Sequence, residues 1–324
     1  MTINDRIYGK FDINSKVIIE LIKSKPLQRL KGISQYGIPN AYYHLNNYSR
    51  YDHSVGVMII LKKLGASEEE QIAGLLHDAS HTAFSHVIDF VMGDGKTEDF
   101  QDKQHLQFVM NSKLPDILSK YGYSADRIVD YHHFGILERN LPDLCADRVD
   151  YSLREFPANV VIDCLPGFTV VQGKIVFKNK RSALMFARNF LKLQLQHWGG
   201  FESVSRYRIF ADVLLQALKE GTISKDDFWQ DDSFVINKLV SSKNQKLQNI
   251  LQVLRHKSLP HLDKSNVKVY VKFRYVDPLF IDNKKLIRLS KASKIFADEL
   301  NIARRLNELG VAIPTISNPV KADI

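Results

Sequence analysis

Apolar residues recur at helical spacing along most of this chain. In the clearest segments they follow one another at intervals of three and four residues, as in amphipathic helices. These segments cover residues 53–64, 67–77, 182–195, 203–219 and 293–309. A serine followed by three glutamates supplies the second segment with an N-cap and an acidic first turn. Helices should therefore form most of the fold.

Two segments in the second half show the pattern of strands instead. Residues 168–177 place a Gln-Gly pair between two short apolar runs, which predicts a hairpin. Residues 267–275 alternate apolar and basic side chains, which predicts a half-buried strand with a cationic face. Such a face either binds an acidic partner or RNA, or only protects the edge of a sheet. We predict a mainly α-helical protein with small β additions in its C-terminal part.

Composition narrows the setting of this fold. The 324 residues, 44% of them apolar, are enough for one large or two modest folded units. The chain begins without a signal-peptide pattern and contains no apolar run that could span a bilayer, so we expect a soluble cytoplasmic protein without a membrane partner. Two cysteines, Cys145 and Cys164, are too few for a disulfide framework.

The charge of the chain is strongly positive. A net charge of +9 favours an anionic partner, such as a nucleotide, and allows weak binding of nucleic acid. The alternative is a basic surface that only keeps the protein soluble.

Histidines gather in one short segment, residues 74–86. An apolar approach ends in His77, Asp78, His81 and His86, a density of imidazole that packing does not require. If the segment is helical, His77 and His81 lie on one face at a spacing of four residues. Neutral imidazole and carboxylate are ligands of divalent cations, and a mixed set accepts several metals.

A second charged segment covers residues 141–155. Asp147, Asp150, Tyr151 and Arg154 share one stripe of a predicted helix that also has an apolar face. This pattern fits either ion pairs on a solvated helix or a functional site. The residues alone do not separate these two interpretations.

Together, three motifs resemble those of the HD-domain metal-dependent phosphohydrolases. Within that superfamily the chain most resembles the deoxynucleoside triphosphate triphosphohydrolase branch, which includes the sterile-alpha-motif-coupled enzyme of animals and bacterial dGTPases. The resemblance runs from about residue 5 to 215. In order, the motifs are Arg50-x-x-His53-Ser54-x-Gly56, His77-Asp78-x-x-His81-x-x-Phe84-Ser85-His86 and Asp147-Arg148-x-Asp150-Tyr151.

The resemblance implies one divalent metal ion, which would be Mn, Fe, Mg, Ni or Zn. Its ligands would be His53, His77, Asp78 and Asp147. Two imidazoles and two carboxylates leave coordination positions open for water and a phosphate oxygen, as in a catalytic site.

Further histidines match positions near the substrate α-phosphate in this family. We expect His81 to contact that phosphate, and either His86 or His105 to protonate the leaving 5′ oxygen. Asp89, three residues after His86, would hold that ring in one tautomer. For each histidine the alternative is a hydrogen-bonded structural group.

Substrate contacts follow from the same resemblance. Arg50, Arg148 and Tyr151 match phosphate contacts, and Gln35 matches a glutamine near the sugar 3′ hydroxyl. Glu155 stands at the place of a sugar-reading aspartate. Two further features are left open: Tyr36 either blocks a ribose 2′ hydroxyl or stacks on a base, and Arg206, Tyr207 and Arg208 either reach the phosphates or lie on the surface.

The expected activity is metal-dependent hydrolysis of a deoxynucleoside triphosphate to deoxynucleoside and triphosphate. A nucleoside monophosphate phosphatase and a nucleotide phosphodiesterase are alternatives with the same site, and a basic nucleic-acid-binding protein with a vestigial site is an alternative of another class. Relatives form dimers or higher homo-oligomers, so we expect at least a dimer. The predicted units are an HD-domain catalytic core, an extension that completes it and a basic α+β subdomain, over 1–160, 161–230 and 231–324.

Overall fold

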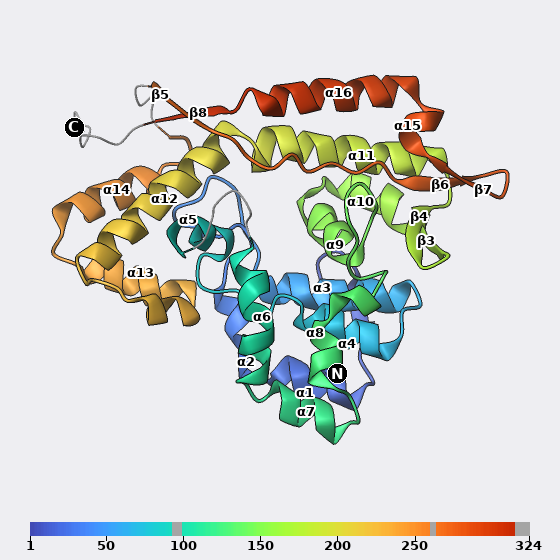
Figure 1. The fold of residues 1–324 in the computed structure, drawn as a ribbon, viewed down its shortest axis with the longest axis horizontal. Helices are drawn as coiled ribbons and strands as arrows, with labels where there is room; N and C mark the ends of the chain where they lie inside the picture. The colour runs from blue at the N-terminus through green and yellow to red at the C-terminus, as the bar shows by residue number, and fades with distance from the viewer. Residues whose placement is uncertain (93–98, 260–263, 315–324) are drawn as a thin grey trace.

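Helices form most of the protein, as predicted (Figure 1). The computed structural model describes residues 1–92, 99–259 and 264–314. The helices of the first half are α1 (Lys16–Lys23), α2 (Lys25–Arg29), α3 (Arg50–Lys63), α4 (Glu68–Leu76), α5 (Asp89–Met92), α6 (Phe100–Met110), α7 (Leu114–Lys120), α8 (Ala125–Val129) and α9 (Ala146–Glu155).

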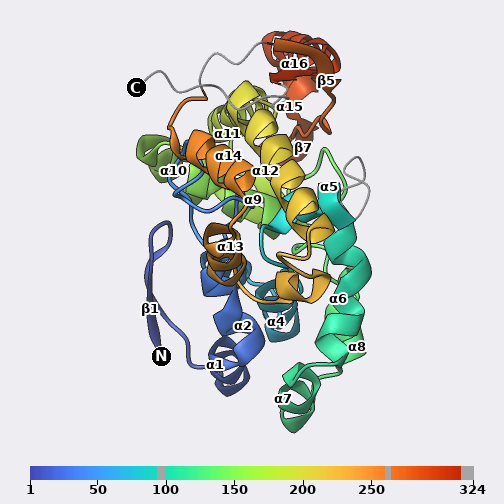
Figure 2. The ribbon, with the colours of Figure 1, turned by 90° about the vertical axis from the view of Figure 1, so that its left-hand side faces the viewer.

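The second half continues with α10 (Ala158–Cys164), α11 (Lys180–Leu193), α12 (Phe201–Lys219), α13 (Asp232–Ser241), α14 (Gln245–Arg255), α15 (Leu289–Ala292) and α16 (Lys294–Glu308). Helices α11 and α16 cross the molecule side by side, and α16 lies on the outside of α11 in both views (Figures 1 and 2). Among the described residues, no helix combines the length and apolar character needed to cross a membrane.

Within the described residues, the strands are short and form three small sheets. They are β1 (Thr2–Asp5), β2 (Gly9–Asp12), β3 (Phe168–Val171), β4 (Lys174–Phe177), β5 (Lys264–Val269), β6 (Leu279–Asp282), β7 (Lys285–Arg288) and β8 (Val311–Pro314). Strands β1 and β2 form an antiparallel hairpin that the sequence did not predict. The predicted hairpin over 168–177 is confirmed as β3 and β4, and β6 joins β4 in parallel to make the order β3-β4-β6-β7.

The predicted strand over 267–275 is wrong beyond Val269. Strand β5 pairs with β8 up to that residue, and the chain then continues without a ladder. Side-chain amides replace the strand partner, because Asn307 donates to the Val271 carbonyl at 2.9 Å and Gln194 donates to the Lys272 carbonyl at 3.2 Å. The segment after β5 is therefore held as an irregular strap.

Helix α3 lies at the centre of the fold. Ser49 caps it, accepting a hydrogen bond from the Asp52 amide at 3.1 Å, while the Asp52 carboxylate accepts one from the Ser49 amide at 3.0 Å. Nearly every residue from His53 to Leu61 is buried, as expected of a helix that contacts neighbours on all sides. This capped start places His53 in the first turn, inside the molecule.

Helix α4 ends one residue earlier than predicted. Its last residue is Leu76, His77 is the C-cap, and Asp78 and His81 follow in a turn. The helical segment that would place His77 and His81 on one face is therefore not formed. Farther along the turn, Phe84 has a φ of 64°, an uncommon conformation for a bulky residue. The buried Asp232 carboxylate accepts the Phe84 amide at 2.8 Å and holds that conformation.

Two apolar cores lie on either side of this turn. The larger core unites α1–α4 with α7–α11 and α16, and the smaller one joins α12–α14 to the loop before α3. The turn after α4 is thereby fixed between them. Residues 260–263 and 315–324 of the predicted subdomain over 231–324 lie outside the described residues, and the three predicted unit boundaries stay predictions.

Candidate metal centre and substrate cleft

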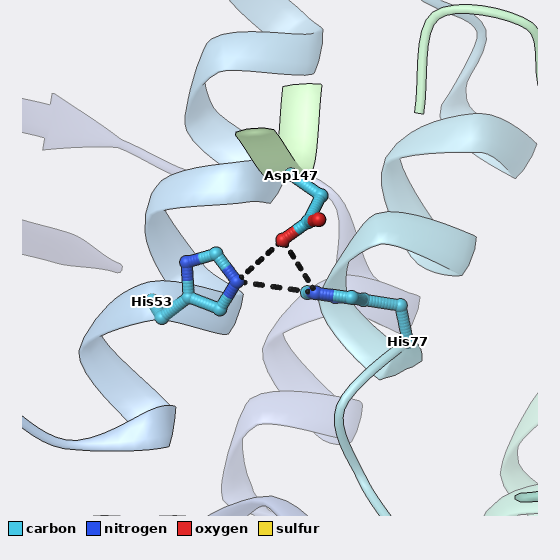
Figure 3. Close-up of side chains that lie close together, drawn as sticks. All are labelled: His53, His77 and Asp147. Carbon is cyan, nitrogen blue, oxygen red and sulfur yellow. Dashed lines mark hydrogen bonds and ion pairs between the residues drawn. The ribbon is translucent and has the colours of Figure 1, made fainter. Parts of the chain in front are cut away.

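Three polar side chains from separate helices converge on one point (Figure 3). His53 comes from the first turn of α3, His77 from the end of α4, and Asp147 from the first turn of α9. His53 Nε2 lies 3.2 Å from His77 Nε2 and 2.9 Å from Asp147 Oδ1. The third side of the triangle, from His77 Nε2 to Asp147 Oδ1, measures 3.6 Å.

The outer nitrogens of both rings determine what the inner nitrogens can do. His53 Nδ1 lies 2.8 Å from Asp150 Oδ2, and His77 Nδ1 lies 2.7 Å from the Gly74 carbonyl. Carboxylate and carbonyl oxygens only accept hydrogen bonds, so each Nδ1 carries the proton. In their neutral forms both rings then direct an Nε2 lone pair at the other ring and at Asp147. Three acceptors facing one another require a cation, so these residues fit a divalent metal.

Asp78, the fourth predicted ligand, lies at the edge of this triangle. Its Oδ1 is 3.5 Å from His77 Nε2, and its Oδ2 is 3.7 Å from His53 Nε2. The same carboxylate pairs with Arg50 Nη1 at 2.8 Å and with His81 Nε2 at 3.2 Å. Asp78 is therefore close enough to join the three acceptors while Arg50 and His81 orient it.

The local field is strongly negative. Burial opposes a charge on His77, but Asp78 and Asp147 outweigh burial and raise the pKa of this imidazole to about 9. Burial also works against ionisation of Asp147, yet hydrogen bonds from the two histidines in their protonated forms hold its pKa well below the usual range. A site with this field binds cations, and a metal would compete with protons for it.

A buried network holds His53 in place. Asp150 accepts hydrogen bonds from Tyr8 Oη at 2.8 Å and Arg154 Nε at 2.7 Å, in addition to its contact with His53. Arg154 Nη2 also pairs with Asp5 at 2.7 Å. Such second partners fix the tautomer and orientation of a ligating imidazole.

Sequence analysis missed the two residues that the N-terminal hairpin brings to this network, Tyr8 and Asp5. The one sign of this network in the sequence was the spacing of four residues between Asp150 and Arg154, which form an ion pair along α9. Close packing of α3 against α9 also depends on Gly56, because a Cβ there would collide with Arg154 Nη2 and Asp150 Oδ1.

His81 and His86 both face the cleft described below. Burial, followed by the neighbouring Arg50 charge, lowers the pKa of His81 to about 3, so this ring is neutral at physiological pH. His86 is more exposed, with its Nδ1 3.3 Å from Asp89 Oδ2. Asp89 is buried and also accepts the Phe100 amide at 3.0 Å, which keeps its carboxylate fixed against His86.

His105 lies behind the cleft wall. Its Nδ1 contacts Ser80 Oγ at 2.9 Å, and its Nε2 contacts Tyr131 Oη at 2.6 Å. Burial lowers the pKa of His105 to about 4. Tyr131, which sequence analysis missed, lines the cleft in its place and also donates to the His77 carbonyl at 3.1 Å.

A cleft of about 770 Å³ opens above the three converging side chains. All the predicted site residues line it except His53, Asp89 and His105, which lie just beneath its surface. The predicted residues in the lining are Gln35, Tyr36, Arg50, His77, Asp78, His81, His86, Asp147, Arg148, Tyr151 and Glu155. We call the part around His53, His77 and Asp147 the metal end.

The opposite part of the cleft, here called the aromatic end, is built around Tyr36, Tyr43, His197 and Trp198. Tyr36 stands edge-on to His197 with ring centroids 4.7 Å apart. Glu155 accepts hydrogen bonds from His197 Nδ1 at 2.6 Å and from Trp198 Nε1 at 3.2 Å. Sequence analysis assigned Glu155 to the place of a sugar-reading aspartate and missed His197 and Trp198, which carry no motif.

Gln35 also reaches this end of the cleft. Its Oε1 is buried and has no hydrogen-bond partner within the described parts of the chain. A buried acceptor of this kind costs free energy unless a ligand supplies a donor.

Two of the side chains predicted to contact phosphate already form hydrogen bonds with other residues of the protein. Arg50 is paired with Asp78, and its Nε donates to Ser85 Oγ at 3.1 Å. Arg148 donates to the carbonyls of Asp143 and Arg139, at 2.8 and 3.2 Å. Both still line the cleft.

Other cations line the cleft from elements that are distant in sequence. Arg208 of α12 and two residues of the strap after β5, Lys272 and Arg274, are among them. Sequence analysis had noted the strap's alternating basic residues without assigning them to the site. Neither option left open for Arg206 is correct, because it is fully buried and donates to the carbonyls of Tyr42 and Leu254 at 2.9 and 2.7 Å.

A second group of metal-type ligands lies next to the first. Glu138, Cys145 and Asp147 present atoms within 4.8 Å of one another. Arg148 Nη1 already lies 3.1 Å from Cys145 Sγ, so a guanidinium occupies the position of a cation there.

Known proteins share this site segment and this fold. The family model for the HD domain matches residues 50–155. An uncharacterized protein of Bacillus subtilis, YdhJ, is 37% identical over 88% of this chain and 90% of its own length. Metal-dependent phosphohydrolase cns2 of Cordyceps militaris is 29% identical over 85% of this chain and 84% of its own.

More distant matches extend the comparison. The human deoxynucleoside triphosphate triphosphohydrolase SAMHD1 is 31% identical, but over only 27% of this chain and 16% of its own. A hypothetical protein from Aquifex aeolicus has a crystal structure with a TM-score of 0.63, at 20% identity and over 94% of this chain and 99% of that one, which shows a shared fold.

The fold and the site together define an HD-domain metal-dependent phosphohydrolase. The chain belongs to the HD-domain family. A divalent metal is the cofactor that this family and the converging ligand atoms imply.

Proposed function

We propose that this protein hydrolyses deoxynucleoside triphosphates to deoxynucleoside and triphosphate. One observation carries the proposal: two imidazoles and Asp147 direct acceptor atoms at one point on the floor of a cleft of about 770 Å³. The volume lies within the range of pockets that enclose whole small-molecule ligands. Cations and an aromatic end suit the two halves of a nucleotide, and partial similarity to the human triphosphohydrolase supports this substrate class.

His53, His77, Asp78 and Asp147 would hold the metal ion. When bound, it would supply Lewis acidity toward water and toward a phosphate oxygen. The residues around it orient the ligands, since Asp150 fixes the His53 ring and the Gly74 carbonyl fixes the His77 ring.

Proton transfer falls to His86. The residue lines the cleft, and the buried Asp89 carboxylate beside its Nδ1 orients the ring that would donate a proton to the leaving 5′ oxygen. His105, the other candidate, has both nitrogens engaged behind the wall, so we assign it the structural role. His81, which lines the cleft beside Asp78, is assigned a contact with the α-phosphate.

The remaining lining residues would bind the two halves of the substrate. We assign Arg50, Arg148 and Tyr151 to the phosphates, and we add Arg208, Lys272 and Arg274 from distant elements, because several cations are needed to balance a triphosphate. At the aromatic end, the unpartnered Gln35 oxygen would accept from a sugar hydroxyl, with Tyr36 and Glu155 beside it.

The decisive experiment offers a panel of dNTPs, NTPs, nucleoside monophosphates and cyclic dinucleotides to protein loaded separately with Mn or Fe. Products are identified by mass, and the reaction is repeated in ¹⁸O-labelled water. Asp147→Ala is the inactive control, and Asp163→Ala, which removes an exposed carboxylate of α10, is its matched partner. Metal content is measured on all three proteins.

Triphosphate released from dNTPs, carrying the labelled oxygen, is the expected result, because water attacks the α-phosphorus. Orthophosphate from monophosphates would make the protein a nucleotidase, and opening of cyclic dinucleotides would make it a phosphodiesterase. Retained metal with no turnover and salt-sensitive RNA binding would overturn the enzymatic proposal in favour of a nucleic-acid-binding protein.

A further inference from the structure

An apolar stripe runs along the outer face of α16. Ile295, Ile302, Leu306 and Leu309 are 67, 51, 50 and 60% exposed. Their spacings of seven, four and three residues keep them on one side of the helix and its C-cap. A different side of the helix, one residue further round from Ile295 and Ile302, is already used, because Phe296, Leu300 and Ala303 are buried in the larger core. The helix therefore presents a second apolar face on the outer edge of the molecule (Figures 1 and 2).

We propose that α16 pairs with α16 of a second copy of this chain, antiparallel and across a two-fold axis near Ile302. An exposed stripe of this kind marks an interaction surface, and two copies of one stripe are complementary when the symmetry axis crosses their centre. Helix α16 is thus the surface for the homodimer.

The charged residues beside the stripe favour a second copy of this chain as the partner, in antiparallel orientation. Asp298 and Arg305, both exposed, stand seven residues apart on the same flank of α16. In an antiparallel helix pair, equal flanks face each other, so Asp298 meets Arg305 of the partner subunit and Arg305 meets the partner's Asp298. A parallel pair places each flank against the partner's other flank and loses both contacts. The helix is thus self-complementary in one arrangement.

The other flank of α16 is fixed to the body of the protein and borders a groove that a partner side chain could enter. Glu299 forms two hydrogen bonds with Arg188 of α11, at 2.8 and 2.7 Å, which fix α16 on the body of the protein. Beside Ile302, a groove of about 370 Å³ lies between the two helices, with Leu191 and Leu195 among its lining residues. An apolar side chain of the partner would fill it. Because one helix face is a small interface, below the ~1,200 Å² lower bound of standard ones, the dimer should dissociate on dilution.

Sedimentation velocity of the full chain at several concentrations tests the proposal. We expect a reversible monomer–dimer equilibrium that Ile302→Asp weakens by about thirtyfold or more, because the substitution buries two like charges at the axis. Ile162→Asp is the matched control, since Ile162 is an isoleucine of α10 that is 71% exposed and lies outside the stripe. Circular dichroism and a melting curve show that both variants are folded.

A charge exchange tests the orientation. Asp298→Arg should weaken the dimer by about fivefold, because it opposes the partner's Arg305, and the double variant Asp298→Arg with Arg305→Asp should restore it. Ile302→Cys, oxidised with diamide, should form a disulfide-linked dimer, whereas Ile162→Cys should not. Both native cysteines are buried, so the introduced thiol is the reactive one.

A chain that remains monomeric at every concentration overturns the proposal, as does a dimer that Ile302→Asp leaves unchanged. A monomer whose binding to anionic phospholipid vesicles is lost in Ile302→Asp would instead make the stripe a membrane-surface contact. Failure of the charge exchange to restore a dimer weakened by Asp298→Arg would contradict the antiparallel orientation.

Discussion

The two ends of the cleft differ in how their buried polar atoms are satisfied. At the metal end, His53, Asp150, Arg154 and Tyr8 form a closed network in which each group bonds to another. Around the aromatic end, three buried atoms have no partner among the described residues, and they are Gln35 Oε1, His44 Nδ1 and Tyr48 Oη. Two buried atoms near the metal end are also unpartnered among the described residues, Ser54 Oγ and the Nε of Arg29, whose Nη2 donates to the His81 carbonyl.

This difference separates a site made for a permanent ligand from one made for a transient ligand. A closed network holds the metal-binding atoms in position before the ion arrives, so little ordering is needed on binding. An unpartnered buried acceptor or donor costs about 1–3 kcal/mol, and a ligand that satisfies it recovers part of that cost. The aromatic end is therefore destabilised in a way that substrate can relieve.

The largest expected effect comes from the metal end. Asp147→Asn keeps the shape of the side chain and removes the negative charge that two imidazole nitrogens face. Turnover should fall by about a thousandfold or more, because Lewis-acid activation is lost. Bound metal, measured by mass spectrometry of the digested protein, should fall with it. An active variant with a full metal content would contradict the assignment of Asp147.

A smaller effect should follow from changing Asp150, which holds the His53 ring in place at the metal end. Asp150→Asn weakens the hold on His53 Nδ1 and should lower metal affinity by about ten- to a hundredfold. Excess metal should then restore most of kcat, which a variant of a direct ligand would not allow. Competition with a chelator measures the affinity, and Asp163→Asn serves as the exposed control. Unchanged affinity would show that Asp150 only stabilises the fold, through Arg154.

Acid should destabilise the fold through His105, which is buried behind the cleft wall near the metal end. Because burial lowers the pKa of His105 from 6.5 to about 4, the unfolded chain binds a proton at a pH where the folded chain does not. The resulting stability is present above pH 6.5 and is lost as the pH falls toward 4. Denaturant melts at both pH values should show wild type losing about 2 kcal/mol more than His105→Gln. Equal losses would mean that His105 accepts a proton in the folded state.

The smallest effect should come from the aromatic end. Gln35→Leu removes the unpartnered amide at similar volume. It should raise KM by about tenfold, which is the worth of one hydrogen bond, while metal content stays unchanged and stability does not fall. Steady-state kinetics and a melting curve measure both. A marked loss of stability would show that Gln35 has a structural partner and that the contrast between the two ends is weaker than proposed.

Local patterns in the sequence were sufficient for the helices and for much of the site. The apolar spacing and the Ser67 cap act over a few residues, so α4 and most of α3 are readable from the chain alone, although α3 begins at Arg50 and not at the predicted residue 53. His53, His77 and Asp147 stand at motif positions, and the structure brings them together. The alternation over 267–275 gives a strand only as far as Val269, because a ladder requires a partner strand. Beyond it the carbonyls of Val271 and Lys272 accept instead from the side chains of Asn307 and Gln194.

Tertiary structure alone decided which residues surround these motifs. Tyr8 bonds to Asp150 across a sequence separation of 142 residues, and His197 bonds to Glu155 across a separation of 42. Tertiary packing, and not local spacing, brings these pairs together. The same holds for His105, whose motif position is unremarkable but whose two nitrogens are engaged by Ser80 and Tyr131. A sequence therefore determines the type of chemistry through residue identity, whereas the low-dielectric interior that orients and shifts each group exists only after folding.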